Sequence, residues 1–167
     1  MEFAASSFYF NSGNVGIGTT TLTAKLQVLG DANTTSIATN NIAETTTISA
    51  TAATGTIALY PSTQSILYYT SNASANWTIN ITFSATNSMS NVMTTGQTMT
   101  VTFMVTQGAT AYYNNVVQVD GVTVTPKWQG GTAPTAGNAN SVDIYTYSAI
   151  KTGAGAFTVF ASVTQFK

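Results

Sequence analysis

Two stretches of the chain alternate strictly between apolar and polar residues. From Trp77 to Phe83 every second residue is apolar, and the same period recurs from Met99 to Thr106, with Met104 facing the other side. Side chains of a β-strand point alternately to its two faces, so this period predicts strands with one buried and one polar face. No window of about 11 residues combines a helical period with helix caps. The sequence therefore predicts an all-β fold.

Turn signals in the last two thirds of the chain predict further strands. Asp120-Gly121 separates two apolar runs, which is the strongest short-range signal for a β-hairpin. Other strand-like segments are expected at 56–60, 65–70, 142–147 and 157–163. About eight strands at this spacing are typical of a sandwich or jelly roll. Residues 55–167 are therefore predicted to form a jelly-roll-like β-sandwich head.

Residues 1–30 carry two short apolar runs. Val15 and Ile17 alternate with glycines, and Leu26 and Val28 share one face of the second run. Glycines at alternate strand positions indicate that another backbone passes close by, and two short strands cannot build a core alone. We expect this N-terminal β segment to serve anchoring and trimerisation, with Val15, Ile17, Leu26 and Val28 buried between three copies of the chain.

Residues 31–54 are rich in Thr and contain no aromatic residue. Their isoleucines, Ile37, Ile42 and Ile48, are spaced too widely for a single strand or helix. Two interpretations remain open. The segment is a flexible linker, or it is a narrow stalk in which three chains bury their isoleucines together and turn their threonines outward.

Composition narrows the class of protein. Hydrophobic residues make up 44% of the 167 residues, which permits a real core, but charged residues make up 5%, where about 25% is usual. A net charge of −1 offers no basic surface for nucleic acid, and no apolar run reaches the roughly 20 residues of a membrane helix. We expect neither nucleic-acid binding nor membrane insertion. A nearly uncharged surface suits a chain that functions inside an assembly.

Catalytic chemistry finds few side chains to use. The chain contains no His and no Cys, which excludes Ser-His-Asp and Cys-His arrangements and the usual zinc sites. A glycosidase needs two carboxylates, and the head offers Asp120, which suits its turn, and Asp143, which could pair with Lys127 or Lys151. We predict that the protein is not an enzyme and has no cofactor or metal.

Aromatic residues near loops are candidates for ligand binding. They are Tyr112, Tyr113, Trp128, Tyr145 and Tyr147, with Asn114, Asn115 and Gln129 nearby. Such rings could stack on sugars while the amides donate and accept hydrogen bonds. The alternative is that they fill the core or contacts between protomers. Tyr145 and Tyr147 point the same way on a strand, so they share one role or the other.

Two segments resemble a known class of protein. Asn14-Val-Gly-Ile-Gly-Thr-Thr-Thr-Leu-Thr-Ala-Lys-Leu-Gln-Val28 resembles the N-V-G-I-G-T-[ST]-x-x-x-x-K-L-x-V segment of phage tail fibres. Much of residues 77–167 looks like a carboxy-terminal module of structural proteins from marine phages, especially cyanophages; it includes Met93–Val101, Thr110–Tyr113 and Gln118–Pro134. The resemblance implies a homotrimeric protein on the virion surface, in contact with other virion proteins.

The resemblance leaves several functions open. The chain is much shorter than typical fibres, without a long shaft or an evident anchoring domain. Either residues 1–30 do the anchoring, or the chain is a fragment, or it is a small decoration protein. We expect a short fibre- or spike-like appendage whose head contacts a host-surface glycan. The alternatives are a capsid or tail decoration protein that stabilises the particle, a bacterial surface adhesin, and a small depolymerase, which would require two carboxylates converging in a cleft.

Overall fold

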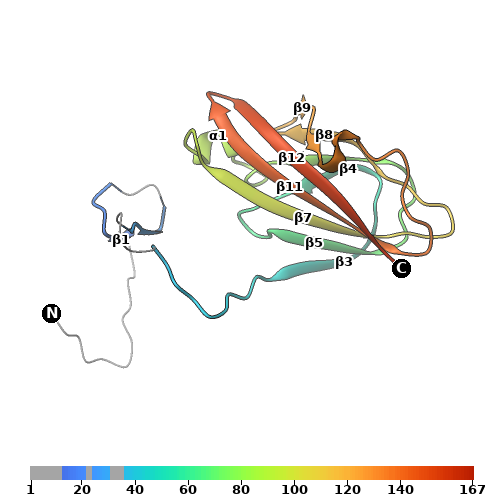
Figure 1. Cartoon of the computed structure of the whole chain (residues 1–167), viewed down its shortest axis with the longest axis horizontal. Coiled ribbons are helices and arrows are strands. Elements are labelled where there is room, and N and C mark those ends of the chain that lie inside the picture. Colours follow the sequence, from blue (N-terminus) through green and yellow to red (C-terminus); the bar gives the residue numbers. More distant parts are fainter. Residues whose placement is uncertain (1–12, 22–23, 31–35) are drawn as a thin grey trace. The chain divides into compact units, whose positions relative to one another are not determined.

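The computed structural model describes residues 13–21, 24–30 and 36–167, and the chain divides into two compact units, Met1–Ala43 and Glu44–Lys167. The described residues consist mainly of strands and turns (Figure 1). The predicted all-β class is therefore confirmed. The second unit is the head.

The described residues of the first unit include a two-stranded parallel sheet. Its strands are β1 (Val15–Ile17) and β2 (Leu26–Val28), with Val15 opposite Leu26 and Ile17 opposite Val28. Paired residues of neighbouring strands point to the same face of a sheet, and successive residues to opposite faces. All four side chains predicted for trimerisation therefore share one face of this sheet, which we call the β1–β2 ribbon.

Gly18 confirms the expected close approach of two backbones. Its φ is 74°, and a Cβ at this position would lie 2.4 Å from the carbonyl oxygen of Leu29. Leu29 is held there because its N–H donates a 2.9 Å hydrogen bond to the carbonyl of Ile17. Glycine is required at this position, since any side chain would collide with backbone.

The head contains ten strands and two short helices. In chain order they are β3 (Thr46–Ala52), β4 (Gly55–Leu59), β5 (Ile66–Ser71), β6 (Trp77–Ile81), α1 (Met89–Val92), β7 (Thr98–Thr106), β8 (Asn114–Val119), β9 (Val122–Val124), β10 (Lys127–Trp128), the 3₁₀ helix η1 (Gln129–Gly131), β11 (Val142–Gly153) and β12 (Ala156–Phe166). They form a six-stranded sheet in the order β10-β12-β11-β7-β5-β3 and a four-stranded sheet in the order β4-β6-β8-β9.

The first six strands of the head wind as coils between the two sheets. β3, β5 and β7 are parallel neighbours in the six-stranded sheet, and β4, β6 and β8 are parallel neighbours in the four-stranded one. The chain thus crosses from one sheet to the other at each step. Antiparallel hairpins follow: β8–β9 completes one sheet, and β11–β12 extends the other.

This connectivity corrects two expectations. The predicted jelly roll is built from antiparallel strands, whereas the head described here has parallel pairs in both sheets. The head also begins at Glu44 rather than at residue 55. Residues 46–52, assigned above to the stalk or linker, form β3, which is the edge strand paired with β5. Its threonines are β-branched and therefore suit a strand.

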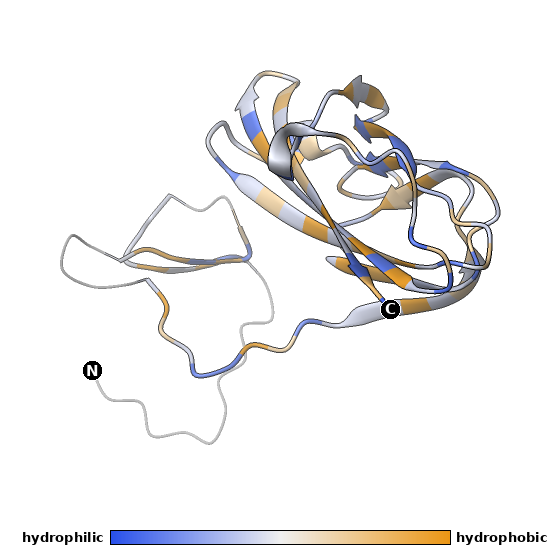
Figure 2. Cartoon of the chain, turned by 45° about the vertical axis from the view of Figure 1, so that its right-hand side comes forward, coloured by the Kyte–Doolittle hydropathy of each residue, from blue (hydrophilic) through white to orange (hydrophobic). Residues whose placement is uncertain are grey.

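The core lies between the two sheets and follows the predicted alternation (Figure 2). In β6 the buried residues are Trp77, Ile79 and Ile81, and in β7 they are Val101, Phe103 and Val105. Aromatic rings meet edge to face at its centre, with the Trp77 and Phe103 centroids 5.8 Å apart. The period of the sequence therefore identified the buried faces of both strands correctly.

The helix α1 is held at both ends by charged side chains from distant parts of the head, the β8–β9 turn and β11. The Asp120 carboxylate accepts hydrogen bonds of 2.7 and 2.9 Å from the backbone N–H groups of Met89 and Ser90. The Lys151 ammonium donates to the carbonyls of Ser90 and Met93, at 2.6 and 2.7 Å. A carboxylate at the amino end and an ammonium at the carboxyl end both complement the helix dipole. Asp120 also occupies the confirmed hairpin turn, with φ 52°.

Candidate functional site

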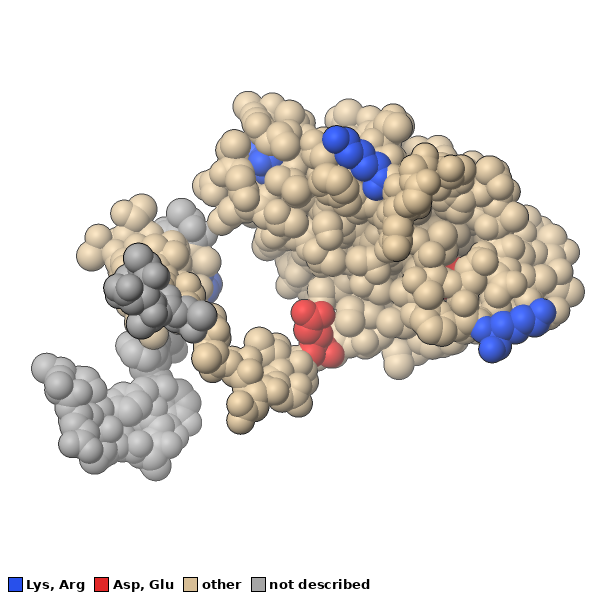
Figure 3. All heavy atoms as spheres, viewed as in Figure 1, with Lys and Arg blue, Asp and Glu red and all other residues tan. Residues whose placement is uncertain are grey.

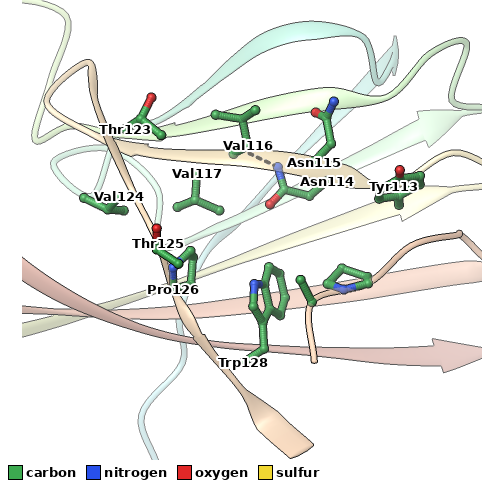
Figure 4. A pocket seen from close by; sticks show the side chains of 12 residues that line it. Tyr113, Asn114, Asn115, Val116, Val117, Thr123, Val124, Thr125, Pro126 and Trp128 are labelled. Atoms are coloured by element: carbon green, nitrogen blue, oxygen red, sulfur yellow. Dashed lines mark hydrogen bonds between the residues drawn. The ribbon is translucent and has the colours of Figure 1, made fainter. Parts of the chain in front are cut away.

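A pocket of about 370 Å³ lies between the β8–β9 hairpin and the segment that leads into β10 (Figure 4). We call it the Trp128 pocket. Its lining comes from β8 and β9, the crossing segment and the following loop: Tyr113, Asn114, Asn115, Val116, Val117, Thr123, Val124, Thr125, Pro126, Trp128, Ala133 and Pro134. These residues carry no charge, and the lining is predominantly apolar.

The pocket exists because the chain leaves one sheet for the other at this point. Val124 ends β9 in the four-stranded sheet, and Trp128 lies opposite Ala161 of β12 in the six-stranded sheet. In Figure 4 the side chains of Val117 and Trp128 point into the space between the two segments, whereas Asn115 and Thr123 lie on the other side of the hairpin. Trp128 is half-buried, so part of its indole remains accessible.

Two buried tyrosines pack against the core side of the Trp128 indole. Its ring meets those of Tyr145 and Tyr147 edge to face, at centroid distances of 6.5 and 6.2 Å. Tyr145 in turn packs edge to face on Trp77, at 5.6 Å. Edge-to-face pairs at these distances are favourable in addition to the area they bury. The aromatic core thereby fixes the orientation of the pocket's largest side chain.

Asn114 connects this aromatic cluster to the backbone of the four-stranded sheet. Its amide Nδ2 donates to the carbonyls of Trp77 and Val116, at 2.9 and 2.7 Å, and its Oδ1 accepts a 3.1 Å hydrogen bond from the Tyr147 hydroxyl. Burial raises the pKa of the Tyr147 hydroxyl well above its ordinary value, and the neighbouring Tyr145 adds to the shift. Tyr147 therefore remains a neutral hydrogen-bond donor at physiological pH.

Asp143 and Gln107 hold the two loops beside the pocket. Asp143 is fully buried and accepts hydrogen bonds of 3.0 Å from the backbone N–H of Asn138 and from the Gln107 side chain. Gln107 also bonds both backbone groups of Tyr112, at 2.7 and 3.0 Å. The expected pairing of Asp143 with Lys127 or Lys151 is wrong, because Asp143 binds these loop groups while Lys151 holds α1.

Burial raises the pKa of the Asp143 carboxyl above its ordinary value of 3.8, and hydrogen bonds from Asn138, Gln107 and Ser141 oppose this shift. A raised pKa means that the folded state binds the proton more tightly than the unfolded state does. The free energy of unfolding therefore falls as the pH rises from the ordinary value through the raised one. Few other side chains titrate in this chain, so the dependence is readily observed.

Replacing Asp143 separates its charge from its hydrogen bonds. Asp143→Asn retains an acceptor for Asn138 and Gln107 and removes the buried charge, so we expect its stability at pH 7 to equal or exceed that of the wild type. Asp143→Ala leaves buried donors unpaired, which costs about 1–3 kcal/mol per group. Denaturant unfolding at several pH values measures both. The account would be contradicted if Asp143→Asn were as unstable as Asp143→Ala. It would also be contradicted if Asp143→Asn kept the pH dependence of the wild type.

The structure distributes the five predicted ligand-binding residues among three roles. Tyr113 and Trp128 line the pocket, and Tyr112 is half-buried beside it with its backbone fixed by Gln107. Tyr145 and Tyr147 are 0% exposed, which corrects their assignment as ligand contacts and supports the alternative that they fill the core. They share one face, as expected. Sequence reasoning missed Pro126 and Pro134, although the loop 129–140, which supplies Pro134, has the length and composition of a functional loop.

Two acidic side chains of the head make hydrogen bonds that hold the fold together. Asp120 and Asp143 are both engaged by backbone N–H groups of different segments. No cluster of three or more His, Cys, Asp or Glu suited to a metal occurs within residues 13–21, 24–30 and 36–167. None of the helices in these ranges is long and apolar enough to span a membrane. A neutral, mostly apolar pocket with an aromatic wall suits the apolar face of an uncharged ring compound.

Comparison with known proteins yields no relatives: no family model, no curated protein and no solved structure matches this chain.

Proposed function

We propose that this chain is a structural protein of a bacteriophage virion, a short homotrimeric fibre- or spike-like appendage on the particle surface whose head binds a host-surface glycan. The observation that carries the proposal is the single apolar face of the β1–β2 ribbon. Ile17 and Leu26 on this face are 57% and 60% exposed in the isolated chain.

The ribbon needs partners because two three-residue strands enclose nothing. Four aliphatic side chains gather on one face, and the opposite face carries Gly16 and Gln27 at the paired positions. Burying a large aliphatic side chain stabilises a protein by about 1.5–3 kcal/mol, which is available here when copies of the ribbon meet around an axis. The resemblance of residues 14–28 to a segment of phage tail fibres supports a threefold arrangement.

The Trp128 pocket supports glycan binding by the head. The indole of Trp128 offers an apolar surface, and its packing on the core fixes the orientation of the ring. The lining of the pocket is uncharged, so it does not favour an ionic ligand. Sugars present one face rich in C–H groups to such rings and direct their hydroxyls to neighbouring polar groups. Three pockets on one trimer would bind a repetitive surface far more tightly than a single pocket, through effective concentration.

Trp128→Ala is expected to weaken binding of the head to a responsive bacterial surface polysaccharide at least about tenfold, since truncation of an aromatic anchor costs about 2 kcal/mol or more and about 1.4 kcal/mol corresponds to tenfold. The probes are purified polysaccharides from candidate hosts, and the readout for both proteins is isothermal titration calorimetry, which does not depend on the indole that the substitution removes. In the wild type, Trp77 is buried in the core, so a ligand-induced change in tryptophan fluorescence would come from Trp128 and would support binding at the pocket.

Tyr112→Ala is the matched control. Tyr112 is also a half-buried aromatic packed on the core, but it does not line the pocket. Equal losses in both variants would indicate general destabilisation and contradict the assignment of the site. A wild-type trimer that binds no polysaccharide of any tested host would overturn glycan binding and favour a decoration protein, which stabilises the particle without contacting a receptor.

A further inference from the structure

The outer face of the six-stranded sheet carries a continuous apolar row. The strand register places Ile48 opposite Tyr68, Tyr68 opposite Met104, and Met104 opposite Ile144, from β3 across β5 and β7 to β11. Their neighbours in each strand, such as Phe103 and Tyr145, point into the core, so these four residues point away from it. Ile48 is 68% exposed, and Phe160 and Phe166 on β12 are also exposed on this face.

The opposite surface of the same sandwich has a different character. The outer face of the four-stranded sheet carries Thr56, Thr78, Asn80, Gln118 and Thr123, with Ala58 and Val116 as its apolar members. Mostly polar residues are expected of a sheet face that contacts water. Ala58 lies opposite Asn80, and Val116 lies opposite Thr78, so no apolar row crosses this face from strand to strand as it does on the six-stranded sheet.

The outer face of the six-stranded sheet also lacks charge. Among the residues of β3, β5, β7, β11 and β12, the two ionisable side chains other than tyrosine are Asp143 and Lys151, and both point inward and are buried. Lys127 lies at the border, on the edge strand β10, with its ammonium 5.8 Å from the centre of the Phe160 ring. Figure 3 shows how few charged side chains the visible surface carries.

This face is large enough for a specific interface. Strands lie about 4.8 Å apart and rise about 3.3 Å per residue, so five strands of roughly nine residues cover roughly 700 Å². A standard protein interface takes about 800 Å² from each partner. The apolar row crosses this face among threonines and serines, and exposed apolar patches rimmed by polar residues mark interaction surfaces.

We infer that the outer face of the six-stranded sheet packs against the same face of two other copies of this chain, so that three sheets enclose a common apolar axis. The inference rests on the proposed homotrimer and extends it from the β1–β2 ribbon to the head. A face without charge can meet copies of itself without like-charge repulsion, and its hydroxyls, such as the Thr100–Ser148 pair at 2.8 Å, remain hydrogen-bonded within each sheet. A ring of three sheets is also a closed assembly.

Because the chain contains no cysteine, a single introduced cysteine reports how accessible its own position is. The full chain is prepared as two variants, Ile144→Cys on the apolar face and Thr78→Cys on the polar face; both residues are half-buried and central in their sheets. N-ethylmaleimide should react at position 144 at least about tenfold more slowly than at position 78, because reaction in the interface requires local opening. Met104→Cys should behave like Ile144→Cys, which covers the possibility that one substitution disturbs assembly.

The mass of each variant in solution distinguishes failure of the proposed trimer from failure of the proposed contact between the six-stranded sheets. Equal rates at both positions in a particle of three copies would overturn this inference and leave the trimer in place. Equal rates in a particle of one copy would overturn both. Slow reaction at position 144 in a single copy would mean that another part of the same chain covers the face, which also overturns the inference.

Discussion

Trp77→Ala is expected to reduce the free energy of unfolding of the head by about 3–5 kcal/mol, the usual cost of truncating a buried aromatic residue to Ala. Trp77 is 1% exposed and packs edge to face on both Phe103 and Tyr145. Its indole therefore packs the buried faces of β6, β7 and β11 against one another. Since domains of this size have about 5–15 kcal/mol of stability, such a loss leaves the variant marginal. Denaturant unfolding followed by tyrosine circular dichroism measures it.

Trp77→Phe is the control for this prediction. The indole Nε1 of Trp77 is buried and has no hydrogen-bond partner among the described residues, so the Phe variant loses volume and no hydrogen bond. We expect it to cost clearly less than the Ala variant. If both variants lose the same free energy of unfolding, a smaller buried ring does not replace the indole, and burial of an aromatic ring does not account for the stability.

Ile17→Asp is expected to weaken the trimer so that it dissociates on dilution. The substitution places a carboxylate on the apolar face of the β1–β2 ribbon, where three copies would bring three like charges together around one axis. Burial of an unpaired charge costs several kcal/mol per ion. Loss of the trimer also removes multivalency, so binding to a polysaccharide-coated surface should fall by about 100- to 10,000-fold while the affinity of each single pocket is unchanged.

Thr20→Asp is the matched control, because it adds the same charge at an exposed position outside the strands of the ribbon. Size-exclusion chromatography with light scattering measures the mass of each variant, and surface-binding kinetics measure the avidity. If Ile17→Asp retains the mass of three copies on dilution as fully as Thr20→Asp does, the ribbon is not a trimerisation element.

The period of the sequence predicted individual strands better than their partners. Alternation from Trp77 to Phe83 and from Met99 to Thr106 identified the buried faces of β6 and β7, and Asp120-Gly121 identified the β8–β9 turn. A period of two residues does not specify which strand lies beside which. The parallel coils of β3 to β8 depend on contacts between segments far apart in the chain, and these leave no local signal.

The candidate site was predicted in part for a similar reason. Tyr113 and Trp128 were identified as loop aromatics, and they line the pocket. Tyr145 and Tyr147 share their strand face with Asp143, and the sequence left open whether the two rings bind a ligand or fill the core. The face is buried because Gln107 and the Asn138 N–H, distant in sequence, satisfy the carboxylate. α1 escaped prediction because its four residues depend on Asp120 and Lys151 rather than on a helical period.

Sedimentation equilibrium of the unmodified chain tests the central claim most directly. The account predicts one species with three times the chain mass of 17.4 kDa, stable on dilution, because the apolar face around Ile17 and Leu26 is buried in sister chains. A monodisperse species of 17.4 kDa at every concentration would contradict the account, since those side chains would then remain in water or find their cover within one molecule.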